Sequence, residues 1–431
     1  MFPHNKTLKK RFRFDWRSLI EKNVEPINAR RHKPDNWLMV ICAIMLVIGL
    51  VIIYSISPAL GLTSGTSGSY FVERQILAIV LAIVAFLITA NIPLDQWRKY
   101  YKYLILAAIL ATMVAVVLPV NPNYPAHRWV RLGSLSFESV DLLIFAILIW
   151  MAHFLALRMK KGLITNFRKT AVPLFALLIG VGVVVAGIQS DLGSTGVIVI
   201  MITVLAFVAG LPFRRIVIIG GIIAALTVVA IAIAPYRIAR VETFLHPDTN
   251  CLTTGYQECQ AIIGVGSGGI AGLGLGSGVQ AYGYLPEADN DSIFAIYAEK
   301  FGFIGSIILL ALFGALFTRI SKIADKAPDN FSRLFVVGVL VWISIEALIN
   351  IGAMIGLLPL KGITLPFISY GGTSVVFFAA AIGLVYQISR YTLYNVPGSE
   401  NLLTRRAGIN DYSSHGRRIG RAYHPDLGDR S

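Results

Sequence analysis

Two kinds of charged side chain that could act on an anionic lipid headgroup lie in one interval of this chain, residues 235–291. Arg237 and Arg240 come near its start, and the run Leu285-Pro-Glu287-Ala-Asp289-Asn-Asp291 closes it. The interval is polar and rich in glycine, whereas the sequence on both sides is apolar. A guanidinium can bind a phosphate through two parallel hydrogen bonds. This interval is therefore where we expect chemistry on a polar headgroup.

The composition places the interval in a membrane protein. Of the 431 residues, 56% are hydrophobic and 14% are charged, and a soluble domain could not shield that much apolar surface from water. Runs of about 20 mostly apolar residues predict transmembrane helices. We therefore predict an all-α, polytopic integral membrane protein with about ten transmembrane helices, at residues 37–56, 74–91, 102–120, 139–157, 171–188, 192–211, 215–234, 292–317, 334–357 and 371–390. The first helix lacks a small-residue cleavage site behind it and is predicted to be an anchor, not a signal peptide.

The basic residues orient these helices. Most of the 38 Lys and Arg residues lie in the two tails or in alternate short loops, and the positive-inside rule assigns that face to the cytoplasm. Both termini are then cytoplasmic, and the loop 235–291 between the seventh and eighth helices lies outside. The predicted domains are a basic cytoplasmic tail (1–36), a transmembrane domain (37–390) and a second basic cytoplasmic tail (391–431).

A net charge of +15 could also indicate a nucleic-acid partner. Neither tail holds a dense basic run with interleaved aromatic residues, so we predict no nucleic-acid partner. Five basic residues lie instead at the outer ends of predicted helices, where positive charge needs compensation. They are Arg128, Arg131, Arg237, Arg240 and Lys361. They could pair locally, or they could bind the diphosphate of a lipid headgroup.

Cysteine, histidine and glycine patterns bear on disulfide formation, metal binding and dinucleotide binding. Cys251 and Cys259 lie in the loop and could form a disulfide in an oxidising compartment or remain two buried thiols. The histidines are isolated in the sequence and offer no metal-binding spacing. The stretch 264–269 fits the dinucleotide pattern G-x-G-x-x-G, but that pattern requires a preceding strand and a βαβ unit. We interpret it as a close-packed or re-entrant loop with sharp turns.

Four segments resemble the SEDS family (shape, elongation, division and sporulation), the FtsW/RodA group of bacterial cell-wall enzymes. They are Arg128-Trp129, Gln189-Ser-Asp-Leu-Gly193, the outer-loop run from Tyr236-Arg-Ile-Ala-Arg240 through Gly255-Tyr-Gln to Leu285-Pro-Glu-Ala, and Lys361-Gly-Ile-Thr-Leu-Pro-Phe-Ile-Ser-Tyr-Gly-Gly-Thr-Ser374. They occur in the family's order along residues 37–390. Some of these residues are more similar to the division branch, FtsW, than to the elongation branch, RodA. They are Arg237, Arg240, the segment 277–280 and the start of the last segment, Lys361-Gly-Ile-Thr.

The resemblance implies a peptidoglycan glycosyltransferase that polymerises lipid II, the undecaprenyl-diphosphate-linked disaccharide pentapeptide, during cell division. Its location would be the outer face of the bacterial cytoplasmic membrane, at the division septum. Its partners would be a class B penicillin-binding protein that acts as transpeptidase, other division proteins and membrane lipid. No soluble cofactor is implied, and a divalent cation at the diphosphate is compatible with the chemistry.

In the family, the aspartate that closes the Leu-Pro-Glu run is the proposed acid/base, and it maps to Asp291. Such a carboxylate would take the proton of the attacking sugar hydroxyl, typically for a gain of about 10²–10⁴-fold, while nearby cations would stabilise the leaving diphosphate. We expect substrate binding from the other charged residues of these segments and from one serine of the signature, namely Glu287, Asp289, Arg128, Arg237, Arg240, Lys361 and Ser369. By position alone, Asp291 could instead cap the helix that follows it.

The chain departs from the family at three places. Where relatives open the fourth helix with a glutamate and a lysine, this chain has Asp141 and Ile144. Asp289-Asn290 replaces the usual His-Thr, which places a second carboxylate close to that of Asp291. Two carboxylates this close could raise the pKa of one of them. Glu346 is an acid inside a predicted helix, where we expect a hydrogen bond within the bundle. Three alternatives to a division polymerase therefore stay open: a lipid II flippase, an elongation polymerase of the RodA type, and a catalytically weakened scaffold for a transpeptidase.

Overall fold

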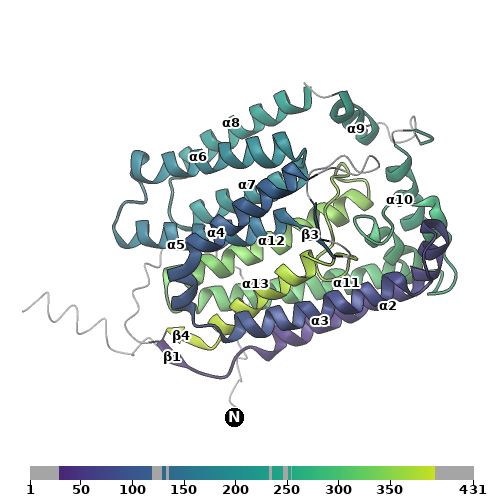
Figure 1. Cartoon of the computed structure of the whole chain (residues 1–431), viewed down its shortest axis with the longest axis horizontal. Coiled ribbons are helices and arrows are strands. Elements are labelled where there is room, and N and C mark those ends of the chain that lie inside the picture. Colours follow the sequence, from purple (N-terminus) through teal and green to yellow (C-terminus); the bar gives the residue numbers. More distant parts are fainter. Residues whose placement is uncertain are drawn as a thin grey trace, which may run out of the picture.

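The computed structural model describes residues 29–118, 129–132, 135–232, 235–245, 251–253 and 255–393, and most of them are helical (Figure 1). Each of the ten predicted apolar ranges coincides with a helical segment. These are α2 (Asn36–Ser64), α3 (Tyr70–Asn91), α4 (Leu94–Val117), α5 (Ser139–Lys160), α6 (Val172–Val181) with the π-helical turns η1 (Phe167–Ala171) and η2 (Gly182–Ile188) at its two ends, α7 (Leu192–Val208), α8 (Phe213–Ala232), α11 (Ile293–Asp325), α12 (Asn330–Met354) and α13 (Ser374–Ile388).

Among the described residues, seven helices are long and apolar enough to cross a membrane, and α7 and α13 are shorter apolar helices. The prediction of an all-α, multi-pass membrane protein is therefore confirmed. Burial follows the same logic. Helices α5 and α12 are buried along most of their length, whereas α3 and α4 bury mainly small residues such as Ala82 and Ala108 and expose their Leu, Ile and Val side chains. Small residues let transmembrane helices pack closely while large apolar ones contact lipid.

Two short antiparallel strand pairs, which the sequence did not predict, accompany the helices. Strand β1 (Ala29–Arg31) pairs with β4 (Tyr391–Leu393), and β2 (Trp129–Leu132) pairs with β3 (Leu135–Glu138). The first pair joins the two ends of the described chain on one side of the bundle. Figure 1 shows β1 and β4 at one end of the molecule and α9 and α10 at the other. Strands β1 and β4 therefore lie away from the helices of the predicted outer loop, and which side faces the cytoplasm stays a prediction.

The predicted outer loop contains more regular structure than expected. It includes α9 (Pro235–Leu245), α10 (Tyr256–Ser267) and the π-helical turn η3 (Gln280–Tyr284). Between α10 and η3, the glycine-rich stretch packs against α11, which is interrupted at Gly302 (φ 63°, ψ −162°). The backbone N–H of Leu273 donates to the Glu299 carbonyl at 2.9 Å, and a Cβ added at Gly268 would lie 2.0 Å from the Ala298 carbonyl oxygen. The close packing expected for residues 264–269 is present at Gly268, but the expected loop is wrong for residues 264–267, which form the last turn of α10.

Candidate active site

Asp291 lies directly before α11, and it is buried, with 9% of its surface exposed. Its carboxylate oxygen Oδ1 accepts a hydrogen bond from Gln257 Nε2 of α10 at 3.3 Å and lies 3.5 Å from Ser292 Oγ. Ser292 occupies the N-cap position of α11. The alternative that Asp291 is the capping residue is therefore wrong, and its carboxylate is held by side chains next to a pocket.

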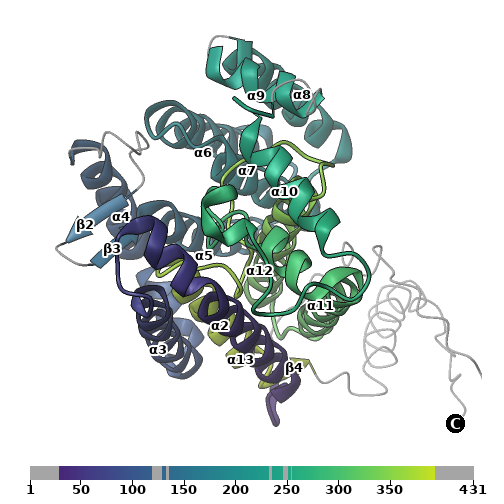
Figure 2. The same cartoon turned by 90° about the vertical axis from the view of Figure 1, so that its right-hand side faces the viewer.

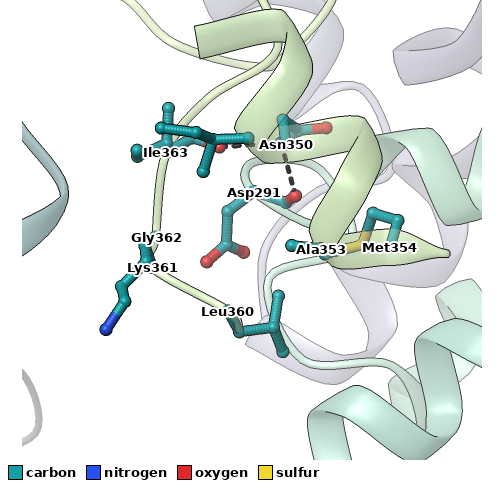
Figure 3. A pocket seen from close by; sticks show the side chains of 9 residues that line it. Asp291, Asn350, Ala353, Met354, Leu360, Lys361, Gly362 and Ile363 are labelled. Carbon is teal, nitrogen blue, oxygen red and sulfur yellow. Dashed lines mark hydrogen bonds between the residues drawn. The ribbon is translucent and has the colours of Figure 1, made fainter. Parts of the chain in front are cut away.

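That pocket is small and lies between the end of α12 and the segment that follows it (Figure 3). Its volume is about 10 Å³, which is room for about one water molecule. The Asp291 carboxylate points into it, whereas the amino group of Lys361 points away from it (Figure 3). A sugar that reacts at Asp291 must therefore approach from the open side of the pocket or widen it.

Asn350 is a site residue that sequence analysis missed. Its side chain in α12 is buried, and Nδ2 donates at 2.7 Å to the backbone carbonyl of Asp291 and at 2.7 Å to that of Ile363. One amide thus joins the acidic loop (residues 285–291) to the signature segment (residues 361–374) (Figure 3). The only signal in the sequence is a single amide side chain between two isoleucines of an apolar helix, and such groups are buried only with hydrogen-bond partners.

The signature segment holds the acidic loop through hydrogen bonds to backbone carbonyls of the loop. Ser369 Oγ donates to the Asn290 carbonyl at 2.7 Å, and the backbone N–H of Tyr370 donates to the Asp289 carbonyl at 2.7 Å. Ser369 is 1% exposed, and its hydroxyl also accepts from the Leu365 N–H at 2.7 Å. In the described structure Ser369 therefore holds the loop, and its predicted contact with substrate stays a prediction.

The acidic loop itself is a tight turn. Glu287 has a positive φ of 50°, which is uncommon for a residue other than glycine, and its carbonyl accepts from the N–H groups of Asn290 and Ser292 at 3.1 and 3.0 Å. Burial, and secondarily the negative charge of Glu287, raise the pKa of Asp289 to about 6. Burial contributes most to this shift, and the neighbouring carboxylate that adds to it is Glu287 rather than Asp291, which was the expected partner.

Tyr370 belongs to the same loop contact. Burial raises the pKa of its hydroxyl to about 12, and the nearby Asp289 carboxylate adds to the shift. The phenol therefore stays protonated at physiological pH.

Another family segment supports the pocket wall from α7. Asp191 caps this helix by accepting from the Ser194 N–H at 3.0 Å. Two residues later, a Cβ added at Gly193 would lie 2.8 Å from the Lys361 carbonyl oxygen. Glycine is needed there because the backbone of the signature segment approaches so closely. Three of the predicted segments therefore meet around the pocket.

The predicted arginines are not placed as fully. Arg128 lies outside the described residues. Arg237 and Arg240 belong to α9, which lies beside α8 (Figures 1 and 2), but their side chains are outside the described part of the structure. Their predicted contact with the diphosphate stays a prediction.

Three of the residues expected to depart from the family, Asp141, Ile144 and Glu346, are buried in the bundle. Asp141 accepts a hydrogen bond from Thr373 Oγ1 of the signature segment at 3.3 Å, and Ile144 is 1% exposed. Glu346 accepts from Trp342 Nε1 at 2.5 Å. The predicted hydrogen bond of Glu346 within the bundle is therefore confirmed.

The remaining predictions concern metal and disulfide. Within the described ranges, no three His, Cys, Asp or Glu residues are grouped to hold a metal ion, and a divalent cation at the diphosphate stays a prediction. Cys251 and Cys259 form a disulfide, with their Cα atoms 5.5 Å apart. This bridge ends in the first turn of α10, the helix that carries Gln257.

Comparisons with known proteins identify the family of this chain. A family model for the FtsW/RodA/SpoVE group, described as a cell cycle protein, matches residues 36–394. The chain belongs to the FtsW/RodA/SpoVE family. Among curated members of that family, it is 34% identical to stage V sporulation protein E of Bacillus subtilis over 369 residues, 85% of this chain and 100% of that protein. It is also 34% identical to the probable peptidoglycan glycosyltransferase FtsW of Hydrogenovibrio crunogenus, over 88% of this chain and 95% of that protein.

Solved structures share the fold of this FtsW/RodA/SpoVE member. One comes from work described as "Structural coordination of polymerization and crosslinking by a peptidoglycan synthase complex", with a TM-score of 0.68 and 25% identity over 83% of this chain and 98% of that one. Another is the rod shape determining protein RodA of Thermus thermophilus, with a TM-score of 0.59 and 23% identity over 83% of this chain and 97% of that one. The second likeness concerns the fold alone.

Proposed function

We propose that this protein is a peptidoglycan glycosyltransferase that polymerises lipid II at the outer surface of the bacterial cytoplasmic membrane, with Asp291 as the acid/base. The observation that carries the proposal is the buried Asp291 carboxylate, held at the junction of three family segments and aimed into a pocket beside Lys361. Curated relatives named probable peptidoglycan glycosyltransferase FtsW, at 30–34% identity over most of the chain, support the same activity.

The reaction follows from the chemistry of these residues. Asp291 accepts the proton of the acceptor sugar hydroxyl, and the hydroxyl oxygen forms a bond to the anomeric carbon of the donor. The bond from that carbon to the diphosphate breaks, and the diphosphate leaves with the electron pair. Lys361, Arg128, Arg237 and Arg240 are the cations that we assign to the leaving diphosphate, where developing negative charge needs stabilisation. A divalent cation could share that task.

Glu287 and Asp289 have separate proposed roles beside the base. Glu287 positions the substrate at the mouth of the acidic loop. Asp289 tunes the charge next to it, because a carboxyl with a pKa of about 6 is partly protonated near neutral pH. Asn350 and Ser369 hold the loop through its backbone carbonyls.

The finer assignments rest on resemblance. We propose the division role, a location at the septum, and partnership with a class B penicillin-binding protein and other division proteins. The description of one structural neighbour as a complex that coordinates polymerization with crosslinking supports the transpeptidase partner. Cytoplasmic termini and the division into tails and transmembrane domain are proposed from the distribution of basic residues.

The test is polymer formation by the purified full-length protein from lipid II, with and without its transpeptidase partner, resolved on a gel. We expect glycan polymer that Asp291→Asn abolishes. Movement of labelled lipid II across vesicles without polymer would indicate the flippase instead, and neither activity would indicate a scaffold. Septal or lateral localisation of a tagged protein in dividing cells separates the division role from the elongation role.

A further inference from the structure

The first turn of α10 contacts both sides of the candidate active site through two consecutive residues. Gln257 Nε2 donates to Asp291 Oδ1 at 3.3 Å and to Ser292 Oγ at 3.0 Å. Glu258 Oε1 accepts from the backbone N–H of Leu360 at 3.3 Å, and Leu360 lines the pocket beside Lys361. One helical turn thus touches the carboxylate and the facing pocket wall.

This turn has little intrinsic support from its own helix. Helix α10 has 12 residues, and its N-cap is Gly255, which has no side chain to cap the helix. An isolated helix of about that length is marginally stable in water. The next residue of the turn, Cys259, is tied by the disulfide to Cys251, eight positions earlier. The disulfide therefore fastens the turn that carries Gln257 and Glu258.

We propose that Gln257 is a positioning residue for the Asp291 carboxylate, and that the Cys251–Cys259 disulfide keeps Gln257 in place, so that reduction of the bridge slows the reaction. The proposal rests on the proposed function. A base must sit within about 0.5 Å of its productive position, and an amide N–H given to a carboxylate fixes its orientation. Such a bond also favours the ionised carboxylate, which is the form that accepts a proton.

Gln257→Met tests the positioning role, because methionine keeps the length of the side chain but cannot donate. We expect kcat for lipid II polymerisation to fall about 10- to 100-fold with KM changed by less than about twofold. The acidic limb of the pH–rate profile should move to higher pH, since the carboxylate loses a donor that favours its charge. Gln260→Met, one turn along the same helix, is the matched control and should resemble the parent in both respects. Equal kcat for Gln257→Met and the parent, or a lower kcat with an unmoved acidic limb, would overturn the positioning role.

The disulfide is tested separately in the full-length protein. Alkylation without reductant should label Cys42 after denaturation but neither Cys251 nor Cys259. Reducing the parent, or changing both bridge residues to serine, should lower kcat by about the same factor as Gln257→Met, whereas Cys42→Ser should be neutral. In the Gln257→Met background, reduction should add little, because residues that act through one contact are not additive. An equal loss from reduction in both backgrounds would show that the bridge acts by another route.

A measurement independent of activity keeps this inference distinct from the proposed function. Hydrogen exchange of the peptide covering residues 285–292 should rise on Gln257→Met and on reduction of the bridge, but not in Gln260→Met. Unchanged exchange would refute the positioning role even in a protein that makes no polymer. If the oxidised parent fails to polymerise lipid II, but exchange rises in Gln257→Met and in the reduced protein as expected, the result would count against the proposed function alone.

Discussion

Replacing Asp291 by asparagine should remove catalysis and leave the fold. Asparagine has nearly the shape of aspartate, and its Oδ1 can still accept from Gln257 Nε2. The backbone carbonyl of residue 291, which accepts from Asn350 at 2.7 Å, is unchanged. Because Ser292 is the N-cap of α11, no capping bond is lost. We expect a change of at most about 1 kcal/mol in stability, the scale of a single altered hydrogen bond.

The catalytic effect should be far larger. An amide does not accept the proton of a sugar hydroxyl at neutral pH, and loss of a general base costs at least about 10²-fold in rate. The assay is polymer from lipid II on a gel, with a thermal unfolding curve in detergent and co-purification of the transpeptidase partner as checks on folding. Asp289→Asn is the matched control, because it removes a neighbouring carboxylate of the same loop.

The outcome distinguishes the two carboxylates. We expect Asp289→Asn to reduce the rate less than Asp291→Asn does. Near-normal polymer from Asp291→Asn together with a clear loss from Asp289→Asn would move the base to Asp289. Normal polymer from both variants would refute the assignment of a catalytic carboxylate to this loop.

Three further predictions concern the pH dependence of Asp289, the hydrogen bonds of Asn350 and the orientation of the helices. Burial raises the pKa of Asp289 to about 6 in the folded protein, so the folded state favours the protonated carboxyl. The contribution of Asp289 to stability is fully present below about pH 4 and is lost as the pH rises through 6. Asp289→Asn should therefore raise Tm relative to the parent at pH 8, and this gain in Tm should vanish near pH 4. Asn350→Leu removes the bonds to the Asp291 and Ile363 carbonyls and should cost about 1–3 kcal/mol, seen as a lower Tm, whereas Ser344→Ala on the same helix should cost little. A topology reporter fused after Lys160 should report the cytoplasm and one after Thr253 the exterior, and the same side for both would contradict the orientation.

Hydropathy predicted where helices lie but not where they end. Helix α2 continues through Pro58 to Ser64 rather than ending near residue 56, and α11 continues to Asp325, beyond its apolar run. A transfer scale detects the part of a helix that lipid covers, and polar turns outside the lipid add no signal. For the same reason α9 and α10, which lie in a polar and glycine-rich interval, were predicted only as loop.

The site was predictable where a family pattern names a residue and not where a contact is made across the fold. Asp291 and Lys361 come from such patterns, and the pocket contains both. Asn350 belongs to no such pattern, and Gln257 belongs to one that gives it no role. Asn350 bonds to residues 59 and 13 positions away in the sequence, and Gln257 bonds to a residue 34 positions away. A lone amide in an apolar helix shows that it must have partners, but only the packing of α12 against the loops shows which partners they are.

The resemblance leads us to expect a lysine in the fourth helix, where this chain has Ile144, so positive charge near the site must come from elsewhere. Ile144 is buried one turn from Asp141, a spacing at which a lysine would face that carboxylate. Here Asp141 accepts from the hydroxyl of Thr373, and Thr373 Oγ1 accepts from the Glu138 N–H at 3.2 Å, so a hydroxyl and a backbone group tie the signature segment to the start of α5. Lys361 belongs to the same signature segment, and its amino group points away from the pocket (Figure 3). We therefore expect the diphosphate to lie on the side of the pocket toward which Lys361 points, with the sugar between it and Asp291.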